Sequence, residues 1–282
     1  MFIEVENLSK SYGDINAVKN ISFTVNEGSL FSFLGTNGAG KSTTINILTT
    51  LLTPTSGTAI IDGHDVAKNP DEVRKLIGIV FQDSIMDDIL TVEENLMVRG
   101  SFYGYKGDQL KQAVQKVITS TKSEDFAKQK YGTLSGGQRR RADIARALIH
   151  TPKILFLDEP TTGLDPKTRQ DVWELIRILQ KEKGMTIFLT THYMEEASTS
   201  DQIIVIHKGE IKAQGTPEEL KERYSQNLLR MTLKSGEQKV IPIKRTTDAL
   251  TIIDDHRDEM THVEIVSGTL DDVFLNLRGE DI

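Results

Sequence analysis

The stretch Gly35-Thr-Asn-Gly-Ala-Gly-Lys-Ser-Thr43 decides the fold of this chain. It satisfies the pattern G-x-x-x-x-G-K-[ST], in which glycines let successive backbone N–H groups point at phosphate oxygens. Leu30–Leu34 reads as a buried strand and 41–52 as a helix whose N-terminus favours an anion. This context argues against a glycine-rich turn with an incidental lysine. We expect a nucleoside triphosphate to be bound by Gly35, Asn37, Gly38, Gly40, Lys41, Ser42 and Thr43, with the Ser42 hydroxyl also reaching Mg²⁺.

Two carboxylates end an apolar run, Lys153-Ile-Leu-Phe-Leu-Asp-Glu-Pro160. Such a run fits a parallel strand buried on both faces, and catalytic groups of parallel sheets lie at the carboxyl ends of strands. Because neighbouring strand residues point to opposite sides, the two carboxylates take different roles. We expect Asp158 to hold Mg²⁺ through water and Glu159 to polarise the attacking water. The alternative is a solvated acidic strand end.

A second anion site is predicted at Leu134-Ser-Gly-Gly-Gln138, ahead of a helix over Arg139–His150. A serine N-cap and two glycines expose N–H groups at the helix start, although a flexible turn is the alternative. With the phosphate loop and the acidic strand end, this motif resembles the signature of ABC ATPases over roughly residues 1–220. The resemblance implies a head-to-tail pair, with a copy or a paralogue, enclosing two ATP molecules. Ser135, Gly137 and Gln138 would then close over the nucleotide of the opposite subunit.

Two aromatic positions match the ABC pattern individually. The resemblance implies that Tyr12 stacks on adenine and that His192, at the end of the strand Thr186–Thr191, contacts the γ-phosphate. The alternatives are a hairpin tyrosine beside a turn and a structural histidine.

Two polar positions also match that pattern. The resemblance implies that Gln82, after the strand Ile77–Phe81, touches Mg²⁺ and the attacking water. It also implies that Asp165 belongs to a loop that signals between the two ATP sites. Without the resemblance, these residues read as a solvated glutamine and an ordinary turn. No catalytic position departs from the pattern, which predicts an active ATPase.

Composition excludes several classes of protein. The chain has 282 residues, no cysteine and a net charge of −7, from 34 basic and 41 acidic residues. The absence of cysteine excludes disulfides and thiolate metal sites. The negative charge argues against a nucleic-acid partner. No apolar run approaches the ~20 residues of a membrane span, and the first residues enter a strand without a leader.

The order of elements predicts an α/β fold with a parallel-sheet core, an antiparallel β subdomain and a helical signature subdomain at about 91–150. Thr91-Val-Glu-Glu94 reads as a capping box at the start of that subdomain. We expect an ATP-binding domain over 1–220 and a small α+β extension over 221–282. The extension either packs on the core or pairs with its copy.

Three weaker motifs resemble the ABC branch that powers ABC-2-type permeases, including daunorubicin-resistance exporters. They are Tyr193-Met-Glu-Glu-Ala197, Gly215-Thr-Pro-Glu-Glu-Leu220 and Leu270-Asp-Asp-Val-Phe-Leu-Asn-Leu277. The resemblance implies an ATPase at the cytoplasmic face of the membrane that powers a separate permease exporting drugs, lipids or similar compounds. The segment Asp83–Leu90 is a candidate docking surface, unless its apolar residues only cover the base of the helical subdomain. The rivals are a soluble ABC ATPase, such as one for iron–sulfur assembly, and a nucleotide-gated regulatory module.

Overall fold

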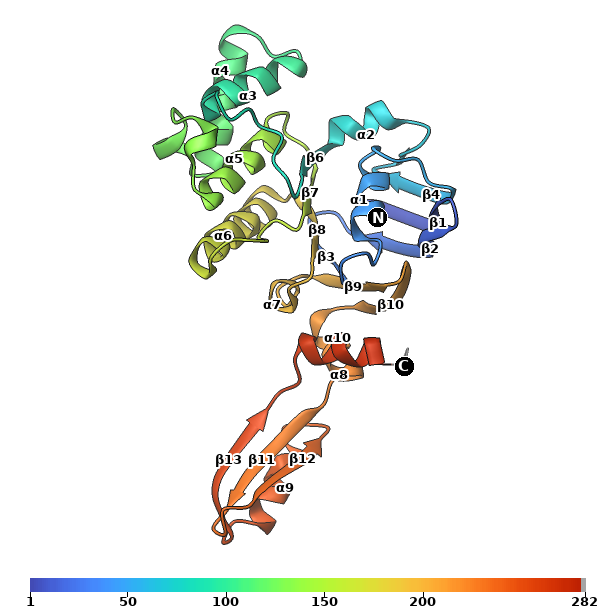
Figure 1. Cartoon of the computed structure of the whole chain (residues 1–282), viewed down its shortest axis with the longest axis vertical. Coiled ribbons are helices and arrows are strands. Elements are labelled where there is room, and N and C mark those ends of the chain that lie inside the picture. The colour runs from blue at the N-terminus through green and yellow to red at the C-terminus, as the bar shows by residue number, and fades with distance from the viewer. Residues whose placement is uncertain (280–282) are drawn as a thin grey trace.

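A six-stranded sheet lies at the centre of the computed structural model, which describes residues 1–279 (Figure 1). Its order is β10 (Glu210–Gly215), β9 (Gln202–His207), β3 (Leu30–Leu34), β8 (Thr186–Thr191), β7 (Ile154–Asp158) and β6 (Ile77–Val80). All neighbouring strands are parallel except β10, which is antiparallel to β9. Strands β3, β7 and β8 are almost wholly buried, as their continuous apolar sequences require. The predicted parallel-sheet core is confirmed.

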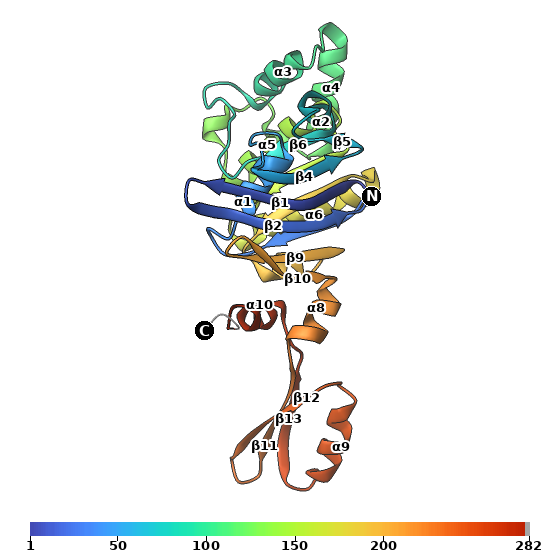
Figure 2. The ribbon, with the colours of Figure 1, turned by 90° about the vertical axis from the view of Figure 1, so that its right-hand side faces the viewer.

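An antiparallel sheet packs beside this core (Figure 2). Its order is β2 (Ile15–Val25), β1 (Ile3–Tyr12), β4 (Ser56–Ile61) and β5 (His64–Asp65). Five phenylalanine rings from both sheets meet, with neighbouring centroids 5.1 to 6.3 Å apart; they belong to Phe23, Phe31, Phe33, Phe156 and Phe188. Helix α1 (Lys41–Leu48) buries Ile45, Ile47 and Leu48 in the same cluster, and α2 (Pro70–Leu76) buries Val73 there.

A helical lobe covers the other face of the central sheet (Figure 1). It consists of α3 (Val92–Phe102), α4 (Gly107–Ser120), two single 3₁₀ turns (Glu124–Phe126 and Tyr131–Thr133) and α5 (Gly136–Leu148), packed against α6 (Pro166–Lys183). The predicted capping box is present, because the Thr91 hydroxyl accepts from Glu94 N and the Glu94 carboxylate accepts from Thr91 N. The predicted helical signature subdomain is confirmed.

The residues after 220 form two units. Strands β12 (Gln238–Ile243), β11 (Asn227–Leu233) and β13 (Met260–Val266) form an antiparallel sheet, and α9 (Asp248–Asp255) packs on one face of it. This unit stands off the rest of the chain (Figures 1 and 2). Helix α10 (Leu270–Gly279) returns to the core and packs on α7 (Met194–Ala197) and α8 (Pro217–Tyr224). The division of the chain at residue 220 stays a prediction.

Among the described residues, no helix combines the length and the apolar composition needed to cross a bilayer.

Candidate active site

The phosphate loop connects β3 to α1, and its glycines are required by positive φ angles or by close backbone approaches. Gly38 and Gly40 have φ of 79° and 109°, which other residues rarely adopt. A Cβ on Gly40 would lie 2.6 Å from Ala17 O, and one on Gly35 would lie 2.5 Å from Ile206 O. Ser42 and Thr43 occupy the first turn of α1. The backbone of this loop therefore excludes other residues at these glycines, and its phosphate-binding role stays a prediction.

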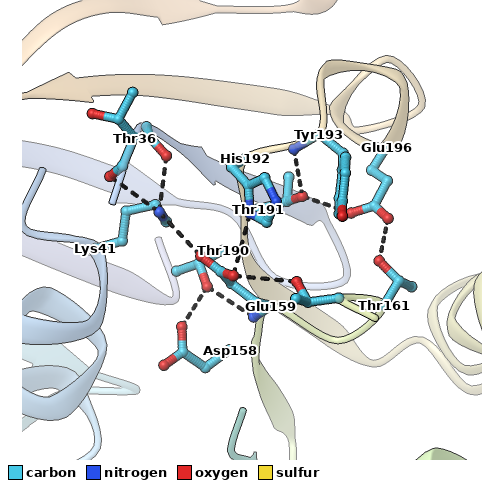
Figure 3. A network of polar contacts seen from close by, with 12 residues as sticks. Thr36, Lys41, Asp158, Glu159, Thr161, Thr190, Thr191, His192, Tyr193 and Glu196 are labelled. Carbon is cyan, nitrogen blue, oxygen red and sulfur yellow. Dashed lines mark hydrogen bonds and ion pairs between the residues drawn. The ribbon is translucent and has the colours of Figure 1, made fainter. Parts of the chain in front are cut away.

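Lys41 lies buried at the base of this loop (Figure 3). Its Nζ donates to Gly35 O at 2.8 Å and to Thr36 O at 3.3 Å, and lies 3.2 Å from Glu159 Oε1. Glu159 is also buried, so the two charges are paired where water scarcely reaches them. The structure thus brings the phosphate loop and the end of β7 to one point.

Glu159 also contacts the loop that follows β8. Its Oε2 lies 3.2 Å from His192 Nδ1, in an orientation that is an electrostatic contact rather than a formed hydrogen bond. Thr162 Oγ1 donates to the same oxygen at 3.2 Å. Burial raises the pKa of the Glu159 carboxyl, but Lys41, His192 and Thr162 together outweigh burial, and the net pKa is lowered from 4.5. Glu159 is therefore a carboxylate at neutral pH, as a general base must be.

Glu159 has φ of 46°, which is uncommon outside glycine. Its N–H donates to Thr190 Oγ1 at 3.0 Å and to Thr190 O at 3.2 Å. Backbone strain of this kind persists where the surroundings over-determine the conformation, and it concentrates at functional sites. Here Thr190 supplies part of that restraint.

β7 ends at Asp158, and Glu159, with φ of 46°, lies outside the strand, so the predicted strand alternation does not set their roles. The Asp158 carboxylate nonetheless takes a different partner from the Glu159 carboxylate. Its Oδ1 accepts from Thr190 Oγ1 at 2.5 Å. In the described part of the chain, no cluster of three His, Cys, Asp or Glu residues could hold a metal by itself. A metal bound with ATP would instead use hydroxyl, amide and carboxylate oxygens at Ser42, Gln82 and Asp158, which are donors of the kind that Mg²⁺ prefers.

Sequence reasoning missed a set of threonines and one glutamate that support this cluster (Figure 3). Glu196, which is buried, accepts from Thr191 Oγ1 at 2.6 Å and from Thr161 Oγ1. Thr191 Oγ1 in turn accepts from Tyr193 N at 2.9 Å. Together with Thr190, these residues tie the loop after Glu159 to the loop of His192. Threonines at strand ends have no signal that distinguishes them from ordinary β-formers.

The signature residues lie on another element. Ser135 is the N-cap of α5, its hydroxyl accepts from Gln138 N, and Gln138 Oε1 accepts from Ser135 N at 3.0 Å. A Cβ on Gly137 would lie 2.2 Å from Thr168 Cγ2, so this glycine also permits close packing on α6. Asp165 caps α6, where its carboxylate accepts from Thr168 N at 3.1 Å. No hydrogen bond or ion pair within residues 1–279 joins these side chains to the Lys41–Glu159 cluster.

Two other predicted positions are exposed. Tyr12 ends β1 with its ring 46% exposed, and Lys10 Nζ lies 5.4 Å from the ring centre. Gln82 follows β6 with an exposed side chain, while its carbonyl accepts from Arg140. Neither side chain touches Glu159 in this structure, so their roles stay predictions.

Comparison with known proteins defines the class. The family model described as "ABC transporter" matches residues 18–162, which is half of the chain. The chain belongs to the ABC transporter family, as an ATP-binding and ATP-hydrolysing subunit.

The relatives of this chain indicate its branch of the ABC transporter family. The daunorubicin/doxorubicin resistance ATP-binding protein of Streptomyces peucetius is 39% identical, over 98% of this chain and 92% of that protein. The Nod factor export ATP-binding protein I of Rhizobium sp. (strain N33) is 41% identical, over 79% and 73%. These relatives confirm the predicted resemblance to the exporter branch and do not support the iron–sulfur assembly alternative.

Solved structures agree with the fold. A dimeric ATP-binding cassette bound to ADP and Pi is 33% identical over 76% of this chain and 98% of that chain, with a TM-score of 0.68. A protein from Clostridium perfringens that is part of an ABC transporter complex is 32% identical, over 78% of this chain and 90% of that chain, with a TM-score of 0.72. The predicted P-loop ABC ATPase fold is confirmed.

Proposed function

We propose that this chain is the ATPase subunit of an ABC-2-type exporter of drugs, lipids or similar compounds. The observation that carries the ATPase part of this proposal is the buried cluster in which Glu159 joins Lys41 and His192. Relatives named for doxorubicin resistance and for Nod factor export support export as the direction. The chain would work at the cytoplasmic face of the membrane, bound to a separate integral-membrane permease.

Within this proposal, each residue of the site has a separate role. Tyr12 stacks on adenine, and the phosphate loop holds the phosphates. Lys41 exchanges its contact with Glu159 for the phosphates, which leaves the Glu159 carboxylate free to accept a proton from water. Ser42, Gln82 and Asp158 would hold Mg²⁺, which supplies positive charge against the charge that develops on the phosphates. His192, already beside Glu159, contacts the γ-phosphate.

The signature residues complete the site of a second subunit. Ser135, Gly137, Gln138 and Asp165 lie at the N-termini of α5 and α6, apart from the Lys41 cluster of their own chain. Exposed N–H groups at such helix starts favour a phosphate. The dimeric cassette with ADP and Pi supports a pair of this kind. The partner is a second copy or a paralogue, and no nucleic-acid partner is expected.

A groove between the core and the helical lobe is a suitable docking site for the permease. It encloses about 410 Å³ and combines exposed apolar side chains with arginines, namely Leu51, Ile85 and Phe102 with Arg74, Arg99 and Arg146. A short amphipathic helix that carries a carboxylate would match this lining. The apolar residues of the segment Asp83–Leu90 are expected to form the docking surface, and for Met86 this expectation is wrong, because Met86 packs inside the lobe.

Replacing Ile85 and Phe102 with serine tests this docking groove. Both side chains are largely exposed, at 59% and 75%, so we expect the folded chain and its basal ATP hydrolysis to be retained. Recovery of the permease from detergent-solubilised membranes should fall at least tenfold. Leu250→Ser on α9, with 63% exposure, is the matched control. Equal permease recovery by both variants would exclude the groove.

The proposed function is tested by purifying the tagged chain from its native membranes and identifying stoichiometric partners by mass spectrometry. A polytopic membrane protein supports the exporter. A set of soluble partners only would overturn it while leaving the ATPase chemistry intact.

A further inference from the structure

The free edge of β6 is held by side chains of α5. β6 is the last strand of the six-stranded sheet, so its outward carbonyls have no strand partner among the described residues. Two arginines of α5 and a histidine just after this helix contact these carbonyls instead. His150 Nε2 lies 2.9 Å from Ile77 O, Arg146 Nη2 donates to Ile79 O at 2.6 Å, and Arg140 Nη1 donates to Phe81 O at 2.8 Å. The two-residue spacing of these carbonyls is that of one edge of a strand.

The last of these contacts reaches the loop of Gln82. Arg140 Nη2 also donates to Gln82 O at 3.3 Å, while the Gln82 side chain remains exposed. The guanidinium is buried, and burial lowers the pKa of Arg140, which the charge of Asp143 partly restores. A buried guanidinium that donates to two consecutive backbone carbonyls fixes the chain direction at that point. The backbone of Gln82 is thus restrained, while its side-chain amide stays exposed and available to contact a ligand.

Asp143 completes the attachment from the same helix. Ser84 Oγ donates to Asp143 Oδ1 at 2.6 Å, and Tyr131 OH lies 3.3 Å from Asp143 Oδ2. Burial raises the pKa of Asp143, and the Ser84 hydrogen bond and the charge of Arg140 oppose that effect. Helix α5, which Ser135 caps, therefore holds the loop after β6 on both sides of residue 83.

We propose that Arg140 and Asp143 are positioning residues for Gln82, fastening its loop to the signature helix so that movement of α5 carries Gln82 with it. This inference rests on the proposed function, in which Ser135 serves the ATP of the opposite subunit and Gln82 serves the ATP of its own. One helix then connects the two sites. Neither side chain touches ATP, so the effect acts through Gln82.

The test compares Arg140→Gln with Arg141→Gln in the purified full chain. Arg141 is a matched control on the same helix, because its guanidinium donates to Lys122 O and stacks over Phe126 within the lobe. For Arg140→Gln we expect kcat for ATP hydrolysis to fall at least tenfold with KM within threefold, since the phosphate cradle is untouched. Arg140→Lys, which keeps one donor group, should recover part of kcat. Similar kinetics for the two glutamine variants would overturn the proposal.

Hydrogen–deuterium exchange over residues 77–90 gives a second readout that needs neither hydrolysis nor a dimer. Exchange should rise at least threefold in Arg140→Gln and stay unchanged in Arg141→Gln; equal exchange contradicts the attachment. If the wild-type chain hydrolysed no ATP, the proposed function would be wrong, whereas the exchange measurement would still test the attachment of the loop to α5.

If Arg140→Gln does not fold, Ser84→Ala replaces it, because Ser84 is exposed. Its kcat should fall about threefold at constant KM, and an unchanged kcat overturns the proposal.

Discussion

At the scale of single residues, the site depends on the pairing of Glu159 with Lys41. Burying either charge alone would destabilise the fold, because only a close opposite charge offsets the free energy lost on desolvation. The lowered pKa of Glu159 keeps it ionised at neutral pH. The contact with Lys41 therefore stabilises the carboxylate that we propose as the general base. Its position could be predicted from the end of an apolar strand, but its contact with His192 could not, since Thr191 and Glu196 set the path of that loop.

Glu159→Gln should lower ATP hydrolysis at least a hundredfold, because general-base catalysis contributes about 10² to 10⁴ in rate. ATP binding should persist and trap a closed dimer, visible as a doubling of mass in light scattering. Glu195→Gln is the control, since Glu195 is exposed on α7 nearby. Normal hydrolysis by Glu159→Gln would show that another group accepts the proton.

At the scale of elements, the signature motif combines a predicted anion site with a packing contact between two helices. The Ser135 cap and two glycines were predicted to expose N–H groups at the start of α5. The structure adds that Gly137 lies against Thr168 of α6, a contact that no local sequence pattern predicts. The helix predicted over 41–52 ends early, at Leu48, because Thr50 turns to φ of 64° and the N–H of Leu51 donates back to Asn46 O at 2.8 Å.

Gly137→Ala should destabilise the chain by about 1–3 kcal/mol, as overpacking does. Its Cβ would lie 2.2 Å from Thr168 Cγ2 and push α5 from α6. The double variant Gly137→Ala, Thr168→Ser removes that methyl and keeps the hydroxyl that donates to Asp165. Urea unfolding should show recovered stability in the double variant. No recovery would mean that the strain lies elsewhere.

His150 makes the contact between α5 and β6 sensitive to acid. Burial lowers its pKa from 6.5 to about 4, partly opposed by the hydrogen bond to Ile77 O. As the pH falls from about 6.5 toward about 4, His150 takes up a proton in the unfolded chain but stays neutral in the folded chain. The stability of the folded chain therefore decreases across that window. We expect a loss of about 1–2 kcal/mol between pH 7 and pH 5 that His150→Gln reduces. Urea unfolding at both pH values measures it, and an identical pH dependence in the variant would contradict the assignment.

At the scale of the whole molecule, the C-terminal residues divide between two packing units. The sheet of β11, β12 and β13 has a small core with α9. Helix α10 instead shares a core with Leu34 and Met194, beside the strands that carry the site. The sequence predicted a small α+β extension and left open whether it packs on the core or pairs with its copy. In this structure the helix packs on the core and the sheet stands off it.

Phe274→Ala in α10 should lower the free energy of unfolding by about 3 kcal/mol, because the ring is buried in the shared core. Leu275→Ala is the neighbouring control, with a side chain 61% exposed. Chemical denaturation of both variants measures the difference. If both are equally stable, α10 does not contribute to the fold of the ATPase core.

The sequence by itself determined the phosphate loop, the acidic strand end, the capping box at Thr91 and the parallel sheet, because each depends on residues adjacent in the chain or at a fixed period. Only the tertiary structure decided that Lys41 meets Glu159, that Glu196 ties the loop of His192, and that Arg140 holds Gln82. These partners lie far apart in the chain. Their meeting is set by the order of strands in the sheet and by the packing of α5 on its edge, which hydrophobic periodicity does not encode.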